Sequence, residues 1–314
     1  MEQIGSDFHE KLLENLSKVI VGKKDMLSLL ITSMVAGGHI LLEDVPGTGK
    51  TKLAKALAKS FQLQFSRIQF TPDLLPTDVT GLNVYDPKSG EFTTRKGPVF
   101  TNILLADEIN RATPRTQAGL LEVMEEHQVT IDGQTYLPGS PFFVIATQNP
   151  VETAGTFPLP EAQLDRFMMK LSVGFPDHDE EINILLKYMD SDPLDTLTSV
   201  VTEEALNQVT KEASAVHVSS AMLDYIVRLT NETRKSNDVL MGVSPRGTLA
   251  LMHAAKAYAC LHGRNFCIPD DVKAVAIPVL SHRLILGYGK SQDCDKFIQT
   301  ILKTVIVPTE DFEK

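Results

Sequence analysis

The chain has 314 residues, of which 43% are apolar and 22% charged, and its formal net charge is −10. This is the composition of a globular protein with a sizeable core, long enough for one large or two modest domains. The acidic balance argues against a general nucleic-acid binder, which usually carries a basic surplus. Three cysteines lack metal-type spacing, and no run resembles a signal peptide or a membrane span, so we expect a cytoplasmic protein with reduced thiols.

The first part of the chain has the pattern of a parallel α/β sandwich. Apolar residues at helical spacing predict two opening helices, over 8–16 and 26–34. Buried strands alternating with helices then predict a parallel sheet. The expected strands are HILLED (39–44), FSRIQF (65–70), NILLADE (102–108), FFVIATQN (142–149) and MKLSVGF (169–175).

Two segments depart from this alternation and predict inserted β-hairpins. One is LNVYDPKSGEFTTRKGPVF (82–100), with a turn at Lys88-Ser89-Gly90, and the other is QVTIDGQTYLP (128–138), with its turn at Asp132-Gly133. After Pro176 the pattern changes to amphipathic helices separated by Pro and Gly. We therefore expect an α/β domain over 1–175 and a smaller, all-helical domain over 176–314.

The segment LEDVPGTGKTKLAKAL (42–57) predicts a phosphate-binding loop between a strand and a helix. Glycines at 47 and 49 let backbone N–H groups turn toward phosphate, and the following helix directs its positive end there. Lys50 supplies a charge for the phosphates, and the Thr51 hydroxyl is placed for Mg²⁺. The nucleotide-binding residues are predicted to be Pro46, Gly47, Thr48, Gly49, Lys50, Thr51 and Lys52.

One position of this loop departs from the motif G-x-x-x-x-G-K-[ST], because Asp44 stands where the first glycine is expected. That position lies at the end of the strand, where glycine is required less strictly than at the other two glycine positions of the motif. A carboxylate beside phosphate would be unfavourable, so the Asp44 side chain is predicted to point away from the nucleotide. The alternative for the whole segment is a glycine turn with an incidental lysine.

Polar side chains end two further strands. In NILLADEIN, Asp107 can hold Mg²⁺ through water and Glu108 can act as the general base that polarises the attacking water. In FFVIATQNP, Asn149 could orient water and sense the γ-phosphate. The alternatives are an acidic pair that caps the next helix and an ordinary Asn-Pro turn.

In this order, the segments VPGTGKT, ILLADEINRA, VIATQNP, FPLPEAQLDRF and SPRGTLAL resemble those of the MoxR family of AAA+ ATPases. The resemblance implies an ATP and Mg²⁺ site in which Asn149 is sensor 1. It also implies that Arg166 is the arginine finger for a neighbouring subunit and Arg246 the sensor-2 arginine of the lid. Val21 and Gly22 match the segment that lines the adenine pocket. Arg166 could instead be a surface or salt-bridged arginine, and Arg246 part of a helix start with Pro at N1.

The resemblance further implies a homo-oligomeric ring, usually a hexamer. It implies chaperone-like action on a client complex, often together with a protein that carries a von Willebrand factor A domain. A chelatase-type or nucleic-acid motor subunit is the alternative within ATPases, and the acidic balance counts against the DNA motor. A nucleotide-gated scaffold with little hydrolysis is the alternative of another class, and the intact Glu108 argues against it.

Overall fold

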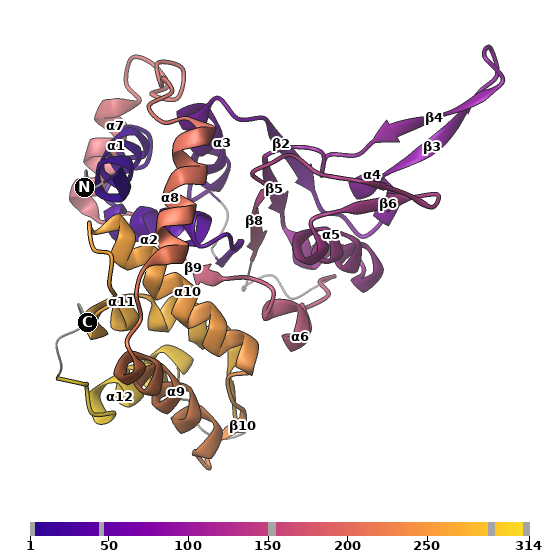
Figure 1. Ribbon diagram of the computed structural model, residues 1–314. Helices are drawn as coiled ribbons and strands as arrows, with labels where there is room; N and C mark the ends of the chain where they lie inside the picture. The colour runs from indigo at the N-terminus through magenta and orange to yellow at the C-terminus, as the bar shows by residue number, and fades with distance from the viewer. Residues whose placement is uncertain (1–3, 44–46, 150–154, 288–292, 310–314) are drawn as a thin grey trace.

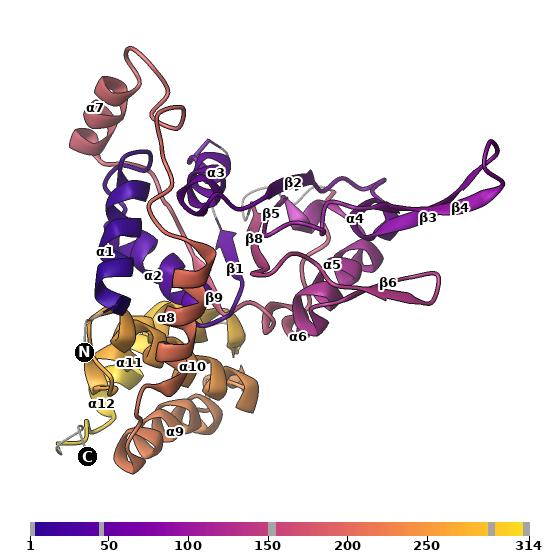
Figure 2. The ribbon, with the colours of Figure 1, turned by 45° about the horizontal axis from the view of Figure 1, so that its top comes forward.

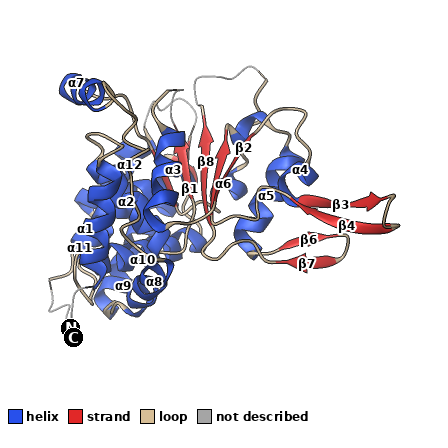
Figure 3. Ribbon diagram, turned by 90° about the horizontal axis from the view of Figure 1, so that it is seen from above, coloured by secondary structure: helices blue, strands red, loops and turns tan. Residues whose placement is uncertain are grey.

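A five-stranded parallel sheet forms the centre of the computed structural model, which describes residues 4–43, 47–149, 155–287 and 293–309. The strand order is β2-β5-β8-β1-β9, and each neighbouring pair is parallel. The five predicted strands are therefore confirmed (Figure 3). Their bounds are β1 (Ile40–Glu43), β2 (Phe65–Gln69), β5 (Ile103–Asp107), β8 (Phe143–Gln148) and β9 (Met169–Leu171).

Alternate residues of the central strands face opposite sides of the sheet and pack into two separate cores, as a period of two requires. Leu41, Leu104 and Val144 lie in the core beneath α4 (Pro76–Thr80) and α5 (Pro114–Glu126). Leu42 and Leu105 face the other side. The helices on that side are α1 (Ile4–Ser17), α2 (Lys24–Val35) and α3 (Lys50–Phe61). The sheet is thus covered on both faces.

The two predicted hairpins are confirmed, and both project from the same side of the sheet (Figures 1 and 2). The first joins β3 (Gly81–Asp86) to β4 (Glu91–Lys96), and the second joins β6 (Val129–Ile131) to β7 (Gln134–Tyr136). Asp132 and Gly133 both have positive φ, of 46° and 82°. Such a pair of left-handed residues matches the twist of a two-residue hairpin turn.

The C-terminal part is helical, as predicted, with one addition. A short antiparallel ribbon, β10 (Val239–Met241) with β11 (Ile285–Leu286), lies among the helices. Strands of three and two residues are too short for a periodic pattern, so the sequence did not predict them. The helices are α7 (His178–Lys187), α8 (Glu203–Ala215), α9 (Ser220–Lys235), α10 (Pro245–Leu261), α11 (Pro269–Leu280) and α12 (Cys294–Thr304). Shorter helices are α6 (Glu161–Leu164), η1 (Ile109–Arg111) and η2 (Ser281–Arg283).

The C-terminal helices pack against the N-terminal ones. Buried residues of α8, α10 and α11 form one continuous cluster with those of α1 and α2, and this cluster reaches one face of the sheet. Figure 1 shows α1 and α2 beside α8 and α10. The domain limits of 1–175 and 176–314 remain a proposal, and the two parts share this core.

His39 joins β1, β8 and α5 inside the sheet core and makes stability depend on pH. Its Nδ1 accepts from the Val144 amide at 3.1 Å, so its Nε2 donates to the Met124 carbonyl at 3.2 Å. Burial lowers the pKa of His39 to about 4, and the Met124 bond only partly opposes this. The imidazole of His39 thus stays neutral in the folded protein at pH values where the unfolded chain, with a histidine pKa near 6.5, is protonated.

We expect the free energy of unfolding to fall as the pH falls from 6.5 toward 4. A shift of this size corresponds to about 3 kcal/mol at the acid end. Urea unfolding across this pH range should show a shallower slope for His39→Gln than for the wild type. Equal slopes in the two proteins would contradict this assignment. Burial also lowers the pKa of His9 to about 4. His9→Gln is therefore the matched variant, and its slope should be shallower in the same way.

Candidate functional site

The phosphate-binding loop leads from the end of β1 into the first turn of α3. Gly47 and Gly49 have φ values of +89° and +85°, in the left-handed region that favours glycine. Gly49 is the N-cap of α3, so the first free N–H groups of this helix point toward the loop. The residues therefore fit a bound phosphate chain. The predictions for Asp44 and Pro46 lie outside the described residues.

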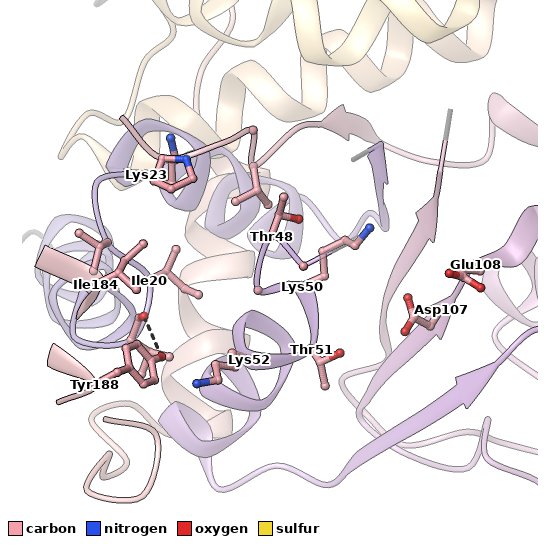
Figure 4. A pocket seen from close by; sticks show the side chains of 17 residues that line it. Ile20, Lys23, Thr48, Lys50, Thr51, Lys52, Asp107, Glu108, Ile184 and Tyr188 are labelled. Atoms are coloured by element: carbon pink, nitrogen blue, oxygen red, sulfur yellow. Dashed lines mark hydrogen bonds between the residues drawn. The ribbon is translucent and has the colours of Figure 1, made fainter. Parts of the chain in front are cut away.

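A pocket of about 560 Å³ lies at this loop and has two chemically different ends. Figure 4 shows Ile20, Ile184 and Tyr188 at one end and the acids Asp107 and Glu108 at the other. The remaining lining residues include Gly47, Thr48, Gly49, Lys50, Thr51 and Lys52 from the loop and α3. An apolar end suits a nucleotide base, and a charged end with a glycine loop suits its phosphates.

The segments before α2 and after β9 form the apolar end. Val21, which the family resemblance assigns to an adenine pocket, is among the lining residues. Gly22 is not among the described lining residues, and its φ is +76°. A β-carbon there would collide with the Glu180 side chain of α7. Glu180 in turn pairs with Lys23 at 2.9 Å, so this glycine allows α7 to close over the base end.

Asp107 ends β5 with both carboxylate oxygens held in place. The Thr147 hydroxyl of β8 donates to Oδ1 at 2.7 Å, and Arg67 of β2 donates to Oδ2 at 2.7 Å. Thr147 also accepts from the Glu108 amide at 2.8 Å. Arg67 and Thr147 were missed by the sequence reasoning. Their signal is positional, since both lie in the strands that flank β5 in the sheet, and Thr147 stands in an otherwise apolar stretch of β8.

Glu108 follows directly in a strained backbone conformation. Its φ is +55°, in the left-handed region that non-glycine residues rarely adopt. Its carboxylate accepts from Gln69 at 2.8 Å and pairs with Arg111 at 2.8 Å. Such strain is characteristic of functional positions, and here it directs a carboxylate into the pocket lining.

Comparisons with known proteins agree with this geometry. A profile described as the ATPase family associated with various cellular activities (AAA) matches residues 39–169, and an AAA lid domain matches 231–304. Chaperone MoxR1 of Mycobacterium tuberculosis is 40% identical, over 98% of this chain and 85% of its own. Protein MoxR of Paracoccus denitrificans is 32% identical, over 90% and 91%.

The chain belongs to the MoxR family of AAA+ ATPases.

Two further relatives cover nearly the whole of this MoxR-family chain. A Bacillus subtilis protein, YeaC, described as uncharacterized, is 48% identical over 96% of this chain and 95% of its own. The crystal structure of a provisionally assigned ATPase from Cytophaga hutchinsonii has a TM-score of 0.89 and 39% identity, covering 98% of both chains. The α/β core and the helical lid are thus those of the family.

Of the remaining predicted residues of this MoxR-family chain, Lys52 lines the pocket and Asn149 does not. The Lys52 ammonium is 3.7 Å from the centre of the Tyr188 ring and 3.0 Å from the Asp192 carboxylate. The Lys52 side chain therefore points away from Asp107 and Glu108 and toward the segment after α7 (Figure 4). Asn149 follows β8, next to the strand that carries Asp107, and is buried. It is not among the described lining residues.

The structure brings the two predicted arginines together and not to the pocket. Arg166 donates from Nε to one oxygen of Glu125 at 2.9 Å, and Arg246 donates from Nη1 to the other at 3.0 Å. Neither arginine is among the described residues that line the pocket. Arg166 follows Asp165, the C-cap of α6, and α6 lies far from α7 in Figures 1 and 2. Their guanidinium groups are partly exposed beside Glu125.

Two negative findings complete the site, each limited to the part of the chain that the structure describes. No helix there combines the length and apolarity needed to cross a membrane. No group of three or more His, Cys, Asp or Glu side chains there could hold a metal ion on its own.

Proposed function

We propose that this chain hydrolyses ATP within a homo-oligomeric ring and uses the cycle for chaperone-like remodelling or maturation of partner complexes. One observation carries the proposal, namely that Arg166 and Arg246 are paired on Glu125 and absent from the described lining of the chain's own pocket. Phosphoryl transfer needs positive charge beside the γ-phosphate. A partly exposed arginine pair outside the described pocket lining can supply this charge to a neighbouring subunit.

Within the pocket, each residue has a proposed task. Lys50 and the amides of the glycine loop hold the β and γ phosphates. Glu108 takes the proton of the attacking water, and Asn149 orients that water. When bound, Mg²⁺ would neutralise phosphate charge, and Thr51 and Asp107 are the residues that would hold it. This set lacks only the positive charge beside the γ-phosphate, which the arginines of a neighbouring subunit would supply.

Coupling to a client would use the segments that the nucleotide touches. The base end is built from the segment before α2 and from α7, so a bound nucleotide contacts both the α/β core and the start of the helical lid. Its loss would change how these parts sit together. The β3–β4 hairpin exposes Tyr85 and Phe92, by 52% and 70%, with ring centres 5.4 Å apart. These aromatic side chains are a candidate client contact.

The remaining parts of the proposal come from the family. A hexameric ring, a partner with a von Willebrand factor A domain and a cytoplasmic location stay predictions. The name of the relative Chaperone MoxR1 supports the chaperone-like role. A nucleotide-gated scaffold is distinguished from this proposal by its lack of turnover in the assembled state.

We expect ATP turnover per subunit to rise with protein concentration, because a dilute subunit lacks its neighbour's arginines. Phosphate release should be followed across a dilution series, with sedimentation giving the assembly state at each point. The affinity for a fluorescent ATP analogue serves as the control, because each pocket binds nucleotide with its own residues. Constant turnover per subunit in samples that sediment as monomers would refute the shared site.

A further inference from the structure

Asp165 connects the segments that carry the two arginines. It lies directly before Arg166, and both of its carboxylate oxygens are engaged. Arg283 of η2 donates from Nε to Oδ1 at 2.6 Å, and the Ser244 hydroxyl donates to Oδ2 at 2.8 Å. One carboxylate thus joins a loop of the α/β core to two elements of the helical part.

Ser244 fixes the start of the helix that carries Arg246. It is the N-cap of α10, and its hydroxyl accepts from the Gly247 amide at 3.2 Å while it donates to Asp165. Arg246 lies two residues further, within the first turn of that helix. The bond from Ser244 to Asp165 therefore sets where the second arginine sits relative to the first.

Arg283 anchors the other side of the loop. Its side chain is only 3% exposed, so its charge is removed from water and needs fixed partners. Besides Asp165, its guanidinium donates to the carbonyls of Phe167 at 2.7 Å and Met168 at 3.3 Å. It also donates to the Val279 carbonyl. Arg283 thereby holds the backbone on both sides of Arg166.

We propose that Asp165, with Ser244 and Arg283, is a positioning residue that holds Arg166 and Arg246 as one preformed pair for a neighbour's phosphate. This inference rests on the proposed function. Glu125 aligns the two guanidinium groups, while Asp165 aligns the two backbone segments behind them. Charge stabilisation is effective when the charges are fixed before the reaction, and small displacements reduce it strongly.

The test separates turnover from binding. Asp165→Asn should lower kcat at least about tenfold while the Kd for ATP and the assembly state stay unchanged. Ser244→Ala removes only one hydrogen bond and should lower kcat about two- to fivefold. In an Arg246→Ala background, Ser244→Ala should have no further effect on kcat, because Ser244 acts through that arginine. A purely structural role would lower kcat by the same factor in both backgrounds and would overturn the proposal.

Matched controls exist elsewhere in the helical part. Asp271→Asn breaks a comparable buried pair with Arg264, and Ser219→Ala removes the N-cap of α9. Both should reduce the free energy of unfolding with little change in kcat. If Asp165→Asn fails to fold because Arg283 loses its partner, the Ser244 comparison decides alone.

Different results would overturn the shared catalytic site and the positioning role of Asp165. Wild-type turnover in Arg166→Ala would overturn the shared site itself. An inactive Arg166→Ala together with folded, fully active Asp165→Asn and Ser244→Ala would overturn only the positioning role.

Discussion

Replacing Arg166 with Ala should lower ATP turnover by about 10³–10⁵-fold, the range known for arginine fingers. The Kd for ATP should stay within about twofold, because Arg166 contacts Glu125 and does not line the pocket. Steady-state phosphate release and titration with a fluorescent analogue measure the two quantities. Arg228→Ala is the control, since Arg228 pairs with Asp224 and donates to the Ile306 carbonyl, and is not among the described residues that line the pocket.

Loss of ATP binding in Arg166→Ala would show that the arginine supports the pocket of its own chain. Its removal frees Glu125 from one partner while Arg246 remains, so the fold should be preserved. Thermal unfolding of the variant checks this point independently of nucleotide.

Replacing Glu108 with Gln should remove the general base and leave ATP bound. We expect turnover to fall at least about 10²-fold. The amide oxygen of Gln can still accept from Gln69, so the strained backbone at position 108 keeps a partner. Rapid separation of the protein followed by quenching should recover ATP, and not ADP, from the variant. The surface variant Glu232→Gln is the control.

If ADP is recovered from Glu108→Gln at the wild-type rate, a group other than Glu108 acts as the general base. Asp107 is the neighbouring carboxylate, although Arg67 and Thr147 already bind its two oxygens. The amount of bound nucleotide in the variant also measures its affinity, so that a binding defect is not mistaken for a chemical one.

The sheet and the phosphate end of the pocket could be predicted because their determinants are local. Short apolar runs such as HILLED mark strands buried on both faces, and the glycines of the loop mark a backbone that other residues avoid. The acids at 107 and 108 then fall at the carboxyl edge of the sheet by the topology of parallel strands. The hairpins were predicted from their turn residues in the same way.

The arrangement of the arginines could not be predicted, because it depends on pairings between distant parts of the chain. Glu125 and Arg246 are far apart in the sequence, and neither residue type reveals its partner locally. The family resemblance assigned Arg246 as the sensor-2 arginine of the lid but gave no sign that it shares Glu125 with Arg166. The shared core of α1, α2, α8 and α10 is equally non-local, since each helix shows only that one of its faces is apolar.

The central claim is that each catalytic centre is completed by a neighbour, and mixing two inactive variants tests it most directly. Glu108→Gln keeps the arginines, and Arg166→Ala keeps the pocket. In a head-to-tail ring, random mixing of equal amounts completes about a quarter of the pockets. We therefore predict that the mixture regains about a quarter of wild-type turnover while each variant alone stays inactive. A mixture as inactive as its components, in rings shown to contain both variants, would contradict the shared catalytic centre.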